Sequence, residues 1–251
     1  MKEREVAVVV GVGPGLGWAL VKRFAAAGMQ VAMAARGKER LEALLQREPL
    51  TGVRSYPCDA TDAGAVAALF DQVEREIGPP DLVVFNVGAY RPGGILEIDP
   101  ADFERCWRIG CFGGFLVGQA AARGMVERGR GTILFTGATA SLRGSSGFAN
   151  LAVPKFGLRA LAQSMARELG PKGIHVAHVV IDGQIRSERY EHLLAQRGPD
   201  ALLEPEAIAE ALLPVAPAAT QRLDSGTRPS ALGRAVLSPP RNERAALDMM
   251  T

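Results

Sequence analysis

The chain has 251 residues, of which 47% are hydrophobic and 22% charged, and these values are typical of one globular domain with a sizeable core. Its formal net charge of +2 gives no electrostatic basis for binding nucleic acid or an anionic membrane surface. No run approaches the roughly 18 apolar residues of a membrane span, and the first apolar run is too short for a signal peptide, so we expect a cytoplasmic protein.

Short β-branched segments alternate with alanine- and leucine-rich amphipathic segments in the first three quarters of the chain. Strands are predicted at 6–11, 30–35, 53–58, 81–86, 131–137 and 174–181. Helices are predicted at 17–28, 37–48, 62–77, 100–128 and 151–169. Strands that alternate with helices predict an α/β fold, namely a single-domain Rossmann-type, doubly wound parallel sheet.

The pattern weakens after residue 183. Residues 185–203 are expected to form a polar, helical excursion, and 205–215 a helix that Pro214 stops. The domain is therefore expected to span 1–215, with a substrate-covering excursion at about 185–215. The remainder, 216–251, is rich in Pro, Ser, Thr and Arg and is expected to be an irregular tail.

Three glycines lie between the first predicted strand and the first predicted helix. Gly11, Gly15 and Gly17 would let the backbone approach a pyrophosphate at the helix N-terminus. A plain turn would use the same residues, but the alternating strands and helices that follow favour a dinucleotide site.

The second predicted strand ends without the carboxylate that usually binds the ribose 2′-hydroxyl. Ala35 stands there, and Arg36 follows it, with Lys38 and Arg40 close behind. The planar guanidinium of Arg36 could pair with a 2′-phosphate, which favours NADP(H) over NAD(H). The alternative is a solvated basic turn.

Further motifs occupy the ends of later strands: "PCDATD", "VVFNVGA", "TILFTGATAS", "LAVPK" and "VVIDGQIRS". Together with the glycine loop, they resemble the short-chain dehydrogenase/reductase family over about residues 5–190. The resemblance implies that Asp59 contacts the adenine and that Asn86 and Gly88 support the sheet and the cofactor. The residues implied to bind the nucleotide are Gly11, Gly15, Leu16, Gly17, Arg36, Asp59, Ala60, Asn86, Gly88, Lys155, Gly183 and Ile185.

The family's catalytic side chains are largely missing from the matching positions. The resemblance implies that Lys155 holds the nicotinamide ribose, but Leu151 stands in place of the proton-donating tyrosine. Ala138 replaces the serine that binds the substrate oxygen, and Gly110 replaces the asparagine of the water relay. Because leucine and alanine carry no acid, base or hydrogen-bond donor, ordinary ketone reduction by the family mechanism is not expected.

Other polar groups could take part in the chemistry instead. Asp182 occupies the family's usual proline position, where it could bind a substrate amine, carry a proton or cap the next turn. Tyr90 is a second catalytic candidate, or else an aromatic residue at the rim of the site. The hydroxyls of Thr136, Thr139 and Ser141 flank Ala138, and one of them could point into the site. Asn150 is expected to cap its helix, and Tyr190 and His192 are expected near the substrate or on the surface. We interpret His175 and His178 as structural residues.

Three functions remain open. The first is an atypical NADP(H)-dependent oxidoreductase acting on a small hydrophobic carbonyl, imine or enone. The others are a non-redox isomerase, dehydratase or cyclase on the same fold, and an inactive nucleotide-binding or partner subunit. We also expect a small-molecule substrate, no metal, three reduced cysteines and a homodimer or homotetramer.

Overall fold

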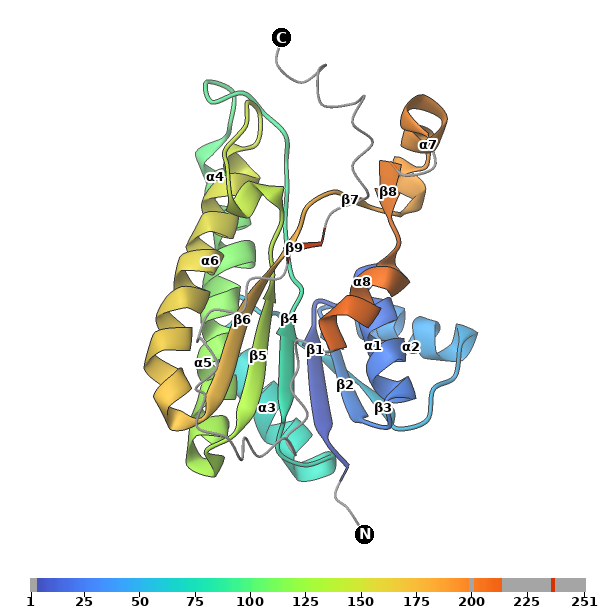
Figure 1. The fold of residues 1–251 in the computed structure, drawn as a ribbon, viewed down its shortest axis with the longest axis vertical. Coiled ribbons are helices and arrows are strands. Elements are labelled where there is room, and N and C mark those ends of the chain that lie inside the picture. Colours follow the sequence, from blue (N-terminus) through green and yellow to red (C-terminus); the bar gives the residue numbers. More distant parts are fainter. Residues whose placement is uncertain (1–3, 199–200, 214–235, 238–251) are drawn as a thin grey trace.

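The β-branched runs of the sequence form a central sheet in which all paired strands are parallel (Figure 1). The computed structural model describes residues 4–198, 201–213 and 236–237. The strands of the main sheet are β1 (Val6–Val10), β2 (Gln30–Ala35), β3 (Val53–Pro57), β4 (Leu82–Phe85), β5 (Gly131–Thr136), β6 (Ile174–Ile181) and β9 (Val236–Leu237). Their order is β3-β2-β1-β4-β5-β6-β9, which confirms the predicted doubly wound α/β architecture.

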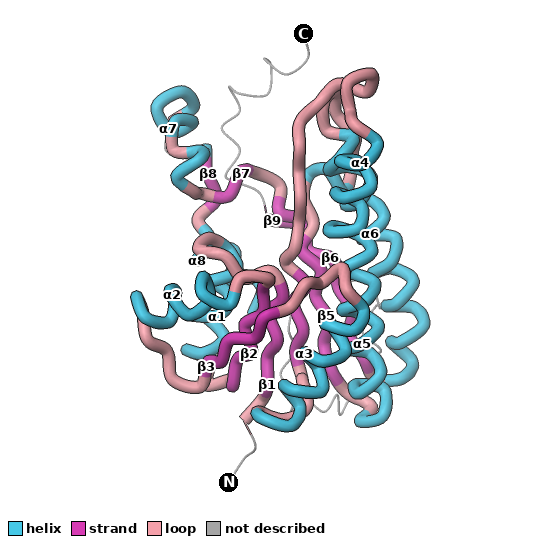
Figure 2. Tube along the Cα trace, turned by 180° about the vertical axis from the view of Figure 1, so that it is seen from behind, coloured by secondary structure: helices cyan, strands magenta, loops and turns pink. Residues whose placement is uncertain are grey.

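Helices cover both faces of this sheet (Figure 2). They are α1 (Leu16–Ala26), α2 (Lys38–Arg47), α3 (Ala63–Glu76), α4 (Pro100–Trp107), α5 (Gly113–Arg128), α6 (Ala149–Leu169), α7 (His192–Arg197) and α8 (Pro205–Leu212). One buried cluster joins the sheet to α3, α5 and α6, and a second joins its other face to α1, α2 and α8. Both faces of the inner strands are therefore buried, which explains why β1 and β4 are continuous apolar runs, whereas the edge strand β3 is more polar and more exposed.

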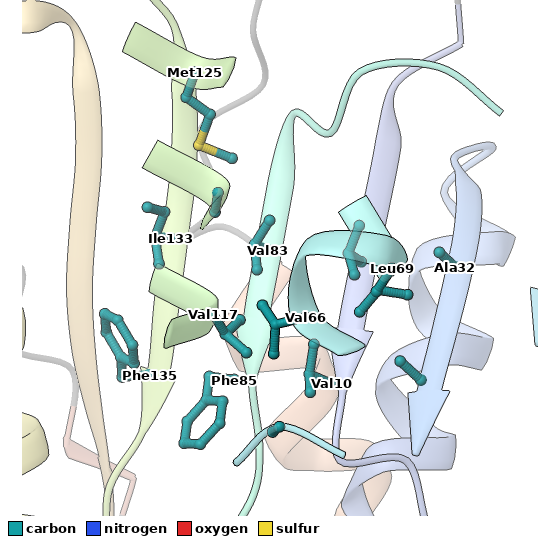
Figure 3. Packing of buried hydrophobic residues seen from close by; sticks show 14 of the residues in the cluster. Val10, Ala32, Val66, Leu69, Val83, Phe85, Val117, Met125, Ile133 and Phe135 are labelled. Atoms are coloured by element: carbon teal, nitrogen blue, oxygen red, sulfur yellow. The ribbon is translucent and has the colours of Figure 1, made fainter. Parts of the chain in front are cut away.

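Alternate residues of each strand enter opposite clusters. Val8 and Val10 face α3, α5 and α6 together with Phe85, whereas Val9 and Val84 face the α1 side. Figure 3 shows the first cluster, in which Val66 and Val117 pack from the helices against Val10 and Phe85 of the strands. This packing fixes the strand ends from which the site is built.

The predicted helix over 100–128 is found as one continuous helical span, Pro100–Arg128, but it is not α-helical throughout. A π-helical turn, η1 (Arg108–Phe112), separates α4 from α5. Gly110 is buried in this turn, and a Cβ atom there would lie 3.1 Å from Cβ of Pro154 in α6. The local distortion therefore accompanies a close approach of two helices, a tertiary contact that periodicity does not report.

The same stretch bears on membrane association. By length and composition, Pro100–Arg128 is the one helical span among the described residues that could cross a membrane. No stretch of this kind was expected from the sequence. Its residues Val117, Ala121 and Met125 are buried against the sheet, and core helices of this kind satisfy the same criteria.

The region after β6 is less helical than expected. Residues 184–203 contain a small parallel pair, β7 (Gln184–Ile185) with β8 (Leu202–Leu203), a 3₁₀ turn at Glu188–Tyr190, and only the short α7. Arg186 Nε lies 2.7 Å from Glu204 Oε1, which ties the start of this excursion to its end. Pairing between residues distant in sequence thus replaces the predicted helix.

The end of the chain is described only in part. Helix α8 ends at Leu212, earlier than the predicted 215, and packs on α1 through ion pairs of Lys22 with Glu206 and Arg23 with Glu210. Most of the tail predicted to be irregular, 216–251, lies outside the described residues. Val236–Leu237 are the exception, because they pair with Val180–Ile181 of β6.

Candidate functional site

A cavity of about 150 Å³ opens at the carboxyl ends of the strands, where the sheet order reverses between β1 and β4. Open α/β sheets bind ligands at this kind of switch point. Its walls bring together residues that follow β1, β2, β3 and β4. They include Gly11, Arg36, Asp59, Ala60 and Gly88 from the predicted set, along with Val10, Ala35, Cys58, Thr61, Val87, Ala89, Arg105 and Ile109.

The glycine loop leaves no room for side chains at two of its positions. Gly11 has a φ of 95°, and a Cβ there would lie 2.6 Å from the carbonyl oxygen of Asn86. A Cβ on Gly17 would lie 2.7 Å from Cα of Val12. Both glycines therefore keep β1, α1 and β4 in close contact at the base of the cavity.

The N-terminus of α1 is open to a ligand. Gly15 is its N-cap, no side chain caps it, and a Cβ on Gly15 would meet nothing within 4 Å. The amides of the first turn, which begins at Leu16 and Gly17, lack intrahelical partners because of their position in the helix. An uncapped helix N-terminus of this length favours an anionic group such as a pyrophosphate.

The charged residues of the cavity come from the turns after β2 and β3. Arg36 is exposed and follows Ala35, so β2 presents a cation where many dinucleotide sites present a carboxylate. Asp59 accepts hydrogen bonds from the Thr61 amide at 2.9 Å and the Thr61 hydroxyl at 2.8 Å. The Thr61 amide, and to a smaller extent the Arg36 guanidinium, hold the pKa of Asp59 below its usual value.

A chain of hydrogen bonds runs across the strand ends from β1 to α6. Asn86 Nδ2 donates to the carbonyl of Gly11 at 3.3 Å, and the Thr136 hydroxyl donates to Asn86 Oδ1 at 3.1 Å. Lys155 Nζ then donates to the carbonyl of Thr136 at 2.8 Å, and a Cβ on Gly88 would lie 3.8 Å from the same nitrogen. The structure therefore brings Asn86, Gly88 and Lys155 close together at the strand ends.

Lys155 is a buried cation, with 7% of its surface exposed. Desolvation by burial lowers the pKa of its ammonium from 10.5 to about 8. Leu158 and Ala162 are also buried on this face of α6, whereas Leu151 and Met165 are only half-buried. The buried position distinguishes Lys155 from a surface lysine whose head reaches solvent.

Leu151 and Ala138 are the apolar residues that the resemblance in sequence matches to a catalytic tyrosine and serine, and that match stays a prediction. Leu151 lies in the first turn of α6, one turn before Lys155. Ala138 follows β5, and its amide donates to the hydroxyl of Ser141 at 3.1 Å. Asn150, expected to cap α6, instead lies within the helix, which begins after Phe148, and its buried amide donates to the Arg91 carbonyl at 2.9 Å.

Asp182 is joined to the turn that follows β5. The Thr139 hydroxyl donates to Asp182 Oδ1 at 2.5 Å, and both residues are half-buried. Asp182 directly follows β6, and Gly183 and then Ile185 of β7 continue from it toward the excursion. This contact between residues 43 positions apart was not expected from the sequence.

Tyr90 lies in the loop between β4 and α4. Its hydroxyl donates to the Gly147 carbonyl at 3.3 Å, and its ring stacks on Phe148 with centroids 5.0 Å apart. Tyr190 is half-buried in the 3₁₀ turn after β7, and His192 begins α7 as an exposed residue. The roles of all three in catalysis stay predictions.

His178 and Ser141 form a buried pair that was not predicted from the sequence. His178 Nε2 lies 3.3 Å from the hydroxyl of Ser141, which is fully buried. Burial, with smaller contributions from Lys155 and Arg159, lowers the pKa of His178 to about 4, so its imidazole is neutral at physiological pH. In the sequence, this contact could have been sought from Ser141, three residues after Ala138, and from His178 on the next strand.

His175 is half-buried on the same strand, and burial lowers its pKa as well. Within the described ranges, no group of three or more His, Cys, Asp or Glu side chains is arranged to hold a metal ion.

The chain matches the family model for short chain dehydrogenases over residues 5–196. It is 33% identical over 181 residues to 3-oxoacyl-[acyl-carrier-protein] reductase MabA of Mycobacterium avium, covering 72% of this chain and 67% of that protein. It is 30% identical to a 3alpha-hydroxysteroid dehydrogenase of Mediterraneibacter gnavus, covering 82% and 81% of the two chains.

Solved structures agree with these sequence matches. A short-chain dehydrogenase from Rhodopseudomonas palustris superposes with a TM-score of 0.77 at 36% identity, covering 94% of this chain and 99% of the other. A short-chain type dehydrogenase/reductase from Mycobacterium marinum gives a TM-score of 0.80 at 28% identity, with coverages of 93% and 94%.

Proposed function

The chain belongs to the short-chain dehydrogenase/reductase family, and on that premise we propose that it binds NADP(H) and acts as an oxidoreductase without the family's tyrosine and serine. The proposed substrate is a small hydrophobic carbonyl, imine or enone. When bound, the nicotinamide would supply or accept a hydride. The observation that carries the proposal is the coexistence of a cavity at the switch point of the sheet with a buried Lys155.

Nucleotide binding is supported by how well the described residues fit such a ligand. Gly11 and Gly17 remove side chains where backbones converge, and the uncapped N-terminus of α1 can receive a pyrophosphate. Lys155 supports the same proposal energetically. An ammonium that has lost its hydration costs the folded protein free energy, and a ribose hydroxyl would give it a second hydrogen-bond acceptor.

The preference for NADP(H) is supported by Arg36. It lines the cavity at the end of β2, where Ala35 presents no carboxylate to repel a 2′-phosphate. Arginine binds phosphate through two parallel N–H donors.

We also propose a homo-oligomer formed through the outer helices. Large apolar side chains are exposed on α4, α5 and α6, namely Trp107, Phe115, Val153 and Phe156. Trp107 and Phe115 both stack with Phe112, so this exposed surface continues across η1. A cytoplasmic location is supported by the free thiols of Cys58, Cys106 and Cys111.

The proposal is tested by titrating the purified protein with NADPH and with NADH, with nicotinamide fluorescence as the measure of binding. We expect tighter binding of NADPH. Replacement Arg36→Ala is expected to weaken NADPH about 10- to 100-fold, since hydrogen bonds to charged groups contribute roughly 1.5–3 kcal/mol, and to leave NADH almost unchanged. Arg47→Ala, which removes an exposed arginine at the far end of α2, is the matched control.

The outcomes separate the open functions. Binding together with NADPH oxidation in a panel of carbonyls, imines and enones supports the proposal. Binding with product formation but no change in nicotinamide absorbance would favour an isomerase, dehydratase or cyclase. Failure to bind either nucleotide would refute the proposal and favour a partner subunit.

A further inference from the structure

One wall of the cavity is formed by the end of α4 and the turn that follows it, and its charged residue is Arg105. Arg105 lies in the last turn of α4, and Ile109 follows four residues later in η1; both line the cavity. The Arg105 side chain is 56% exposed, so a ligand in the cavity can reach its guanidinium. No role was predicted for Arg105 from the sequence.

An ion pair holds Arg105 at this wall. Its Nη2 donates to Oδ1 of Asp102 at 3.1 Å, three residues earlier in the same helix. The other oxygen of this carboxylate, Oδ2, lies 2.9 Å from Nη1 of Arg91 in the loop before α4. The Arg91 carbonyl in turn accepts a hydrogen bond from Asn150, a buried residue of α6. Exposed ion pairs contribute little to stability, so we assign to this one an orienting role.

The cavity is too small for a whole dinucleotide, so its lining residues bind one part of such a ligand. Sites for small-molecule ligands usually measure roughly 300–1,000 Å³, whereas this cavity has about 150 Å³. Apart from its charged residues, much of the lining is small or apolar, including Ala35, Ala60, Val87 and Ala89. Such a lining suits a flat ring better than a phosphate group.

The carboxylate of Asp59 narrows the choice of ring. Its pKa lies below the usual value, so it is ionised at neutral pH and repels phosphate. Both hydrogen bonds from Thr61 go to Oδ1, and an ionised carboxylate accepts through Oδ2 as well. The ring expected beside Asp59 therefore carries an N–H donor, as adenine does in its exocyclic amino group.

The Arg105 guanidinium is suited to the face of such a ring. Guanidinium groups are planar and stack on aromatic faces, where the ring also attracts their positive charge. The N–H donors of a guanidinium point outward in its plane. The hydrogen bond from Arg105 to Asp102 therefore fixes one edge of the group and does not use its faces.

We propose that Arg105, oriented by Asp102, binds the adenine ring of the nucleotide by stacking its guanidinium on the face of that ring. The proposal rests on the proposed nucleotide binding and adds a binding residue that a helix contributes. NADPH and NADH contain the same adenine ring. Arg105 therefore strengthens the binding of both nucleotides equally, whereas Arg36 acts on the 2′-phosphate of NADPH.

Fluorescence titration with NADPH and with NADH, each at low and at high salt, tests the proposal. Arg105→Ala is expected to weaken both nucleotides about three- to tenfold, the range for a cation on an aromatic face. Because the ring carries no net charge, this factor should stay nearly constant between about 0.05 and about 0.5 M salt. The effect of Arg36→Ala on NADPH should instead shrink, because salt screens the phosphate.

Two further variants assign the effect to the ring contact and to its orientation. Arg108→Ala is the matched control, because Arg108 is an exposed arginine of the same helical span, lies 3.9 Å from Glu104 and is not part of the cavity wall. It should leave both affinities unchanged. Asp102→Asn should weaken both nucleotides in the wild-type chain and have no further effect when Arg105 is already alanine.

The outcomes separate this inference from nucleotide binding itself. A wild-type protein that binds neither nucleotide refutes the proposed function. If the wild type binds and Arg105→Ala binds equally well, the inference is overturned and nucleotide binding stands. A loss confined to NADPH, or a loss for both nucleotides that disappears at high salt, would assign Arg105 to a phosphate group and would also overturn the inference. A loss from Asp102→Asn that persists in the Arg105→Ala background would overturn the orienting role of Asp102.

Discussion

Replacing Lys155 by methionine should stabilise the protein while weakening its hold on the nucleotide. In the folded chain, burial lowers the pKa of Lys155 from 10.5 to about 8. The difference between these two pKa values corresponds to about 3 kcal/mol. At pH 7, where the buried amine stays protonated, the free energy of unfolding is lower by this amount. Methionine removes that cost but also removes the hydrogen bond to Thr136, worth about 1 kcal/mol.

We therefore expect Lys155→Met to raise the free energy of unfolding at pH 7 by about 2 kcal/mol, equivalent to about 4–8 °C in Tm. Between pH 8 and 10.5 the unfolded wild-type chain binds the proton that the folded chain has released, so wild-type stability rises with pH. The difference in the free energy of unfolding between Lys155→Met and the wild type should accordingly fall to about zero by pH 10. Affinity for NADPH should fall about tenfold, because the ribose would lose a charged donor.

Urea unfolding at pH 7 and pH 10, with NADPH titration by fluorescence, measures these effects. Lys172→Met, at an exposed position, is the control and should stay within about 0.5 kcal/mol of wild type. A stability difference that is the same at both pH values would refute the explanation by a desolvated ammonium. Unchanged NADPH affinity would refute the role proposed for Lys155 in the site.

Three further predictions concern other parts of the fold. Gly137→Ala should destabilise the chain by about 1–3 kcal/mol in urea unfolding, because its Cβ would lie 2.1 Å from Cε1 of His178. Gly144→Ala is the control and should be nearly neutral, because its Cβ would meet nothing within 4 Å. Phe156→Glu, on the exposed face of α6, should give monomers in analytical ultracentrifugation with little change in unfolding; an unchanged mass would contradict the proposed interface. Leu151→Tyr with Ala138→Ser should create NADPH-dependent ketone reduction at least about 100 times above wild type, and no gain in a variant that binds NADPH would show that more than two side chains are missing.

The sequence predicted the strands of the sheet well, because a strand buried on both faces is a continuous apolar run whose ends are marked by polar or glycine residues. All six predicted strands are found within one residue of their expected ends. The π-helical turn within the helix over 100–128 could not be predicted, since it accompanies the close approach of Gly110 to Pro154 of another helix. Strand β9 is two residues long, too short for any periodic signal.

The candidate site, too, was predicted from the sequence only in part. Gly11, Arg36, Asp59, Ala60 and Gly88 were predicted to lie together and do line the cavity, because they come after strands whose carboxyl ends meet at one edge of the parallel sheet. The pairing of Thr139 with Asp182 was not expected, although both residues were candidates. Their contact depends on how two turns pack after neighbouring strands, and sequence spacing carries no information about it.

The packing of Gly137 against His178 couples two positions that lie on different strands. A side chain at position 137 would force the imidazole of His178 to move, so every residue other than glycine lowers stability there while the histidine is present. The cost of a mutation at position 137, just before the turn that carries Ala138 and Thr139, therefore depends on which residue stands at position 178.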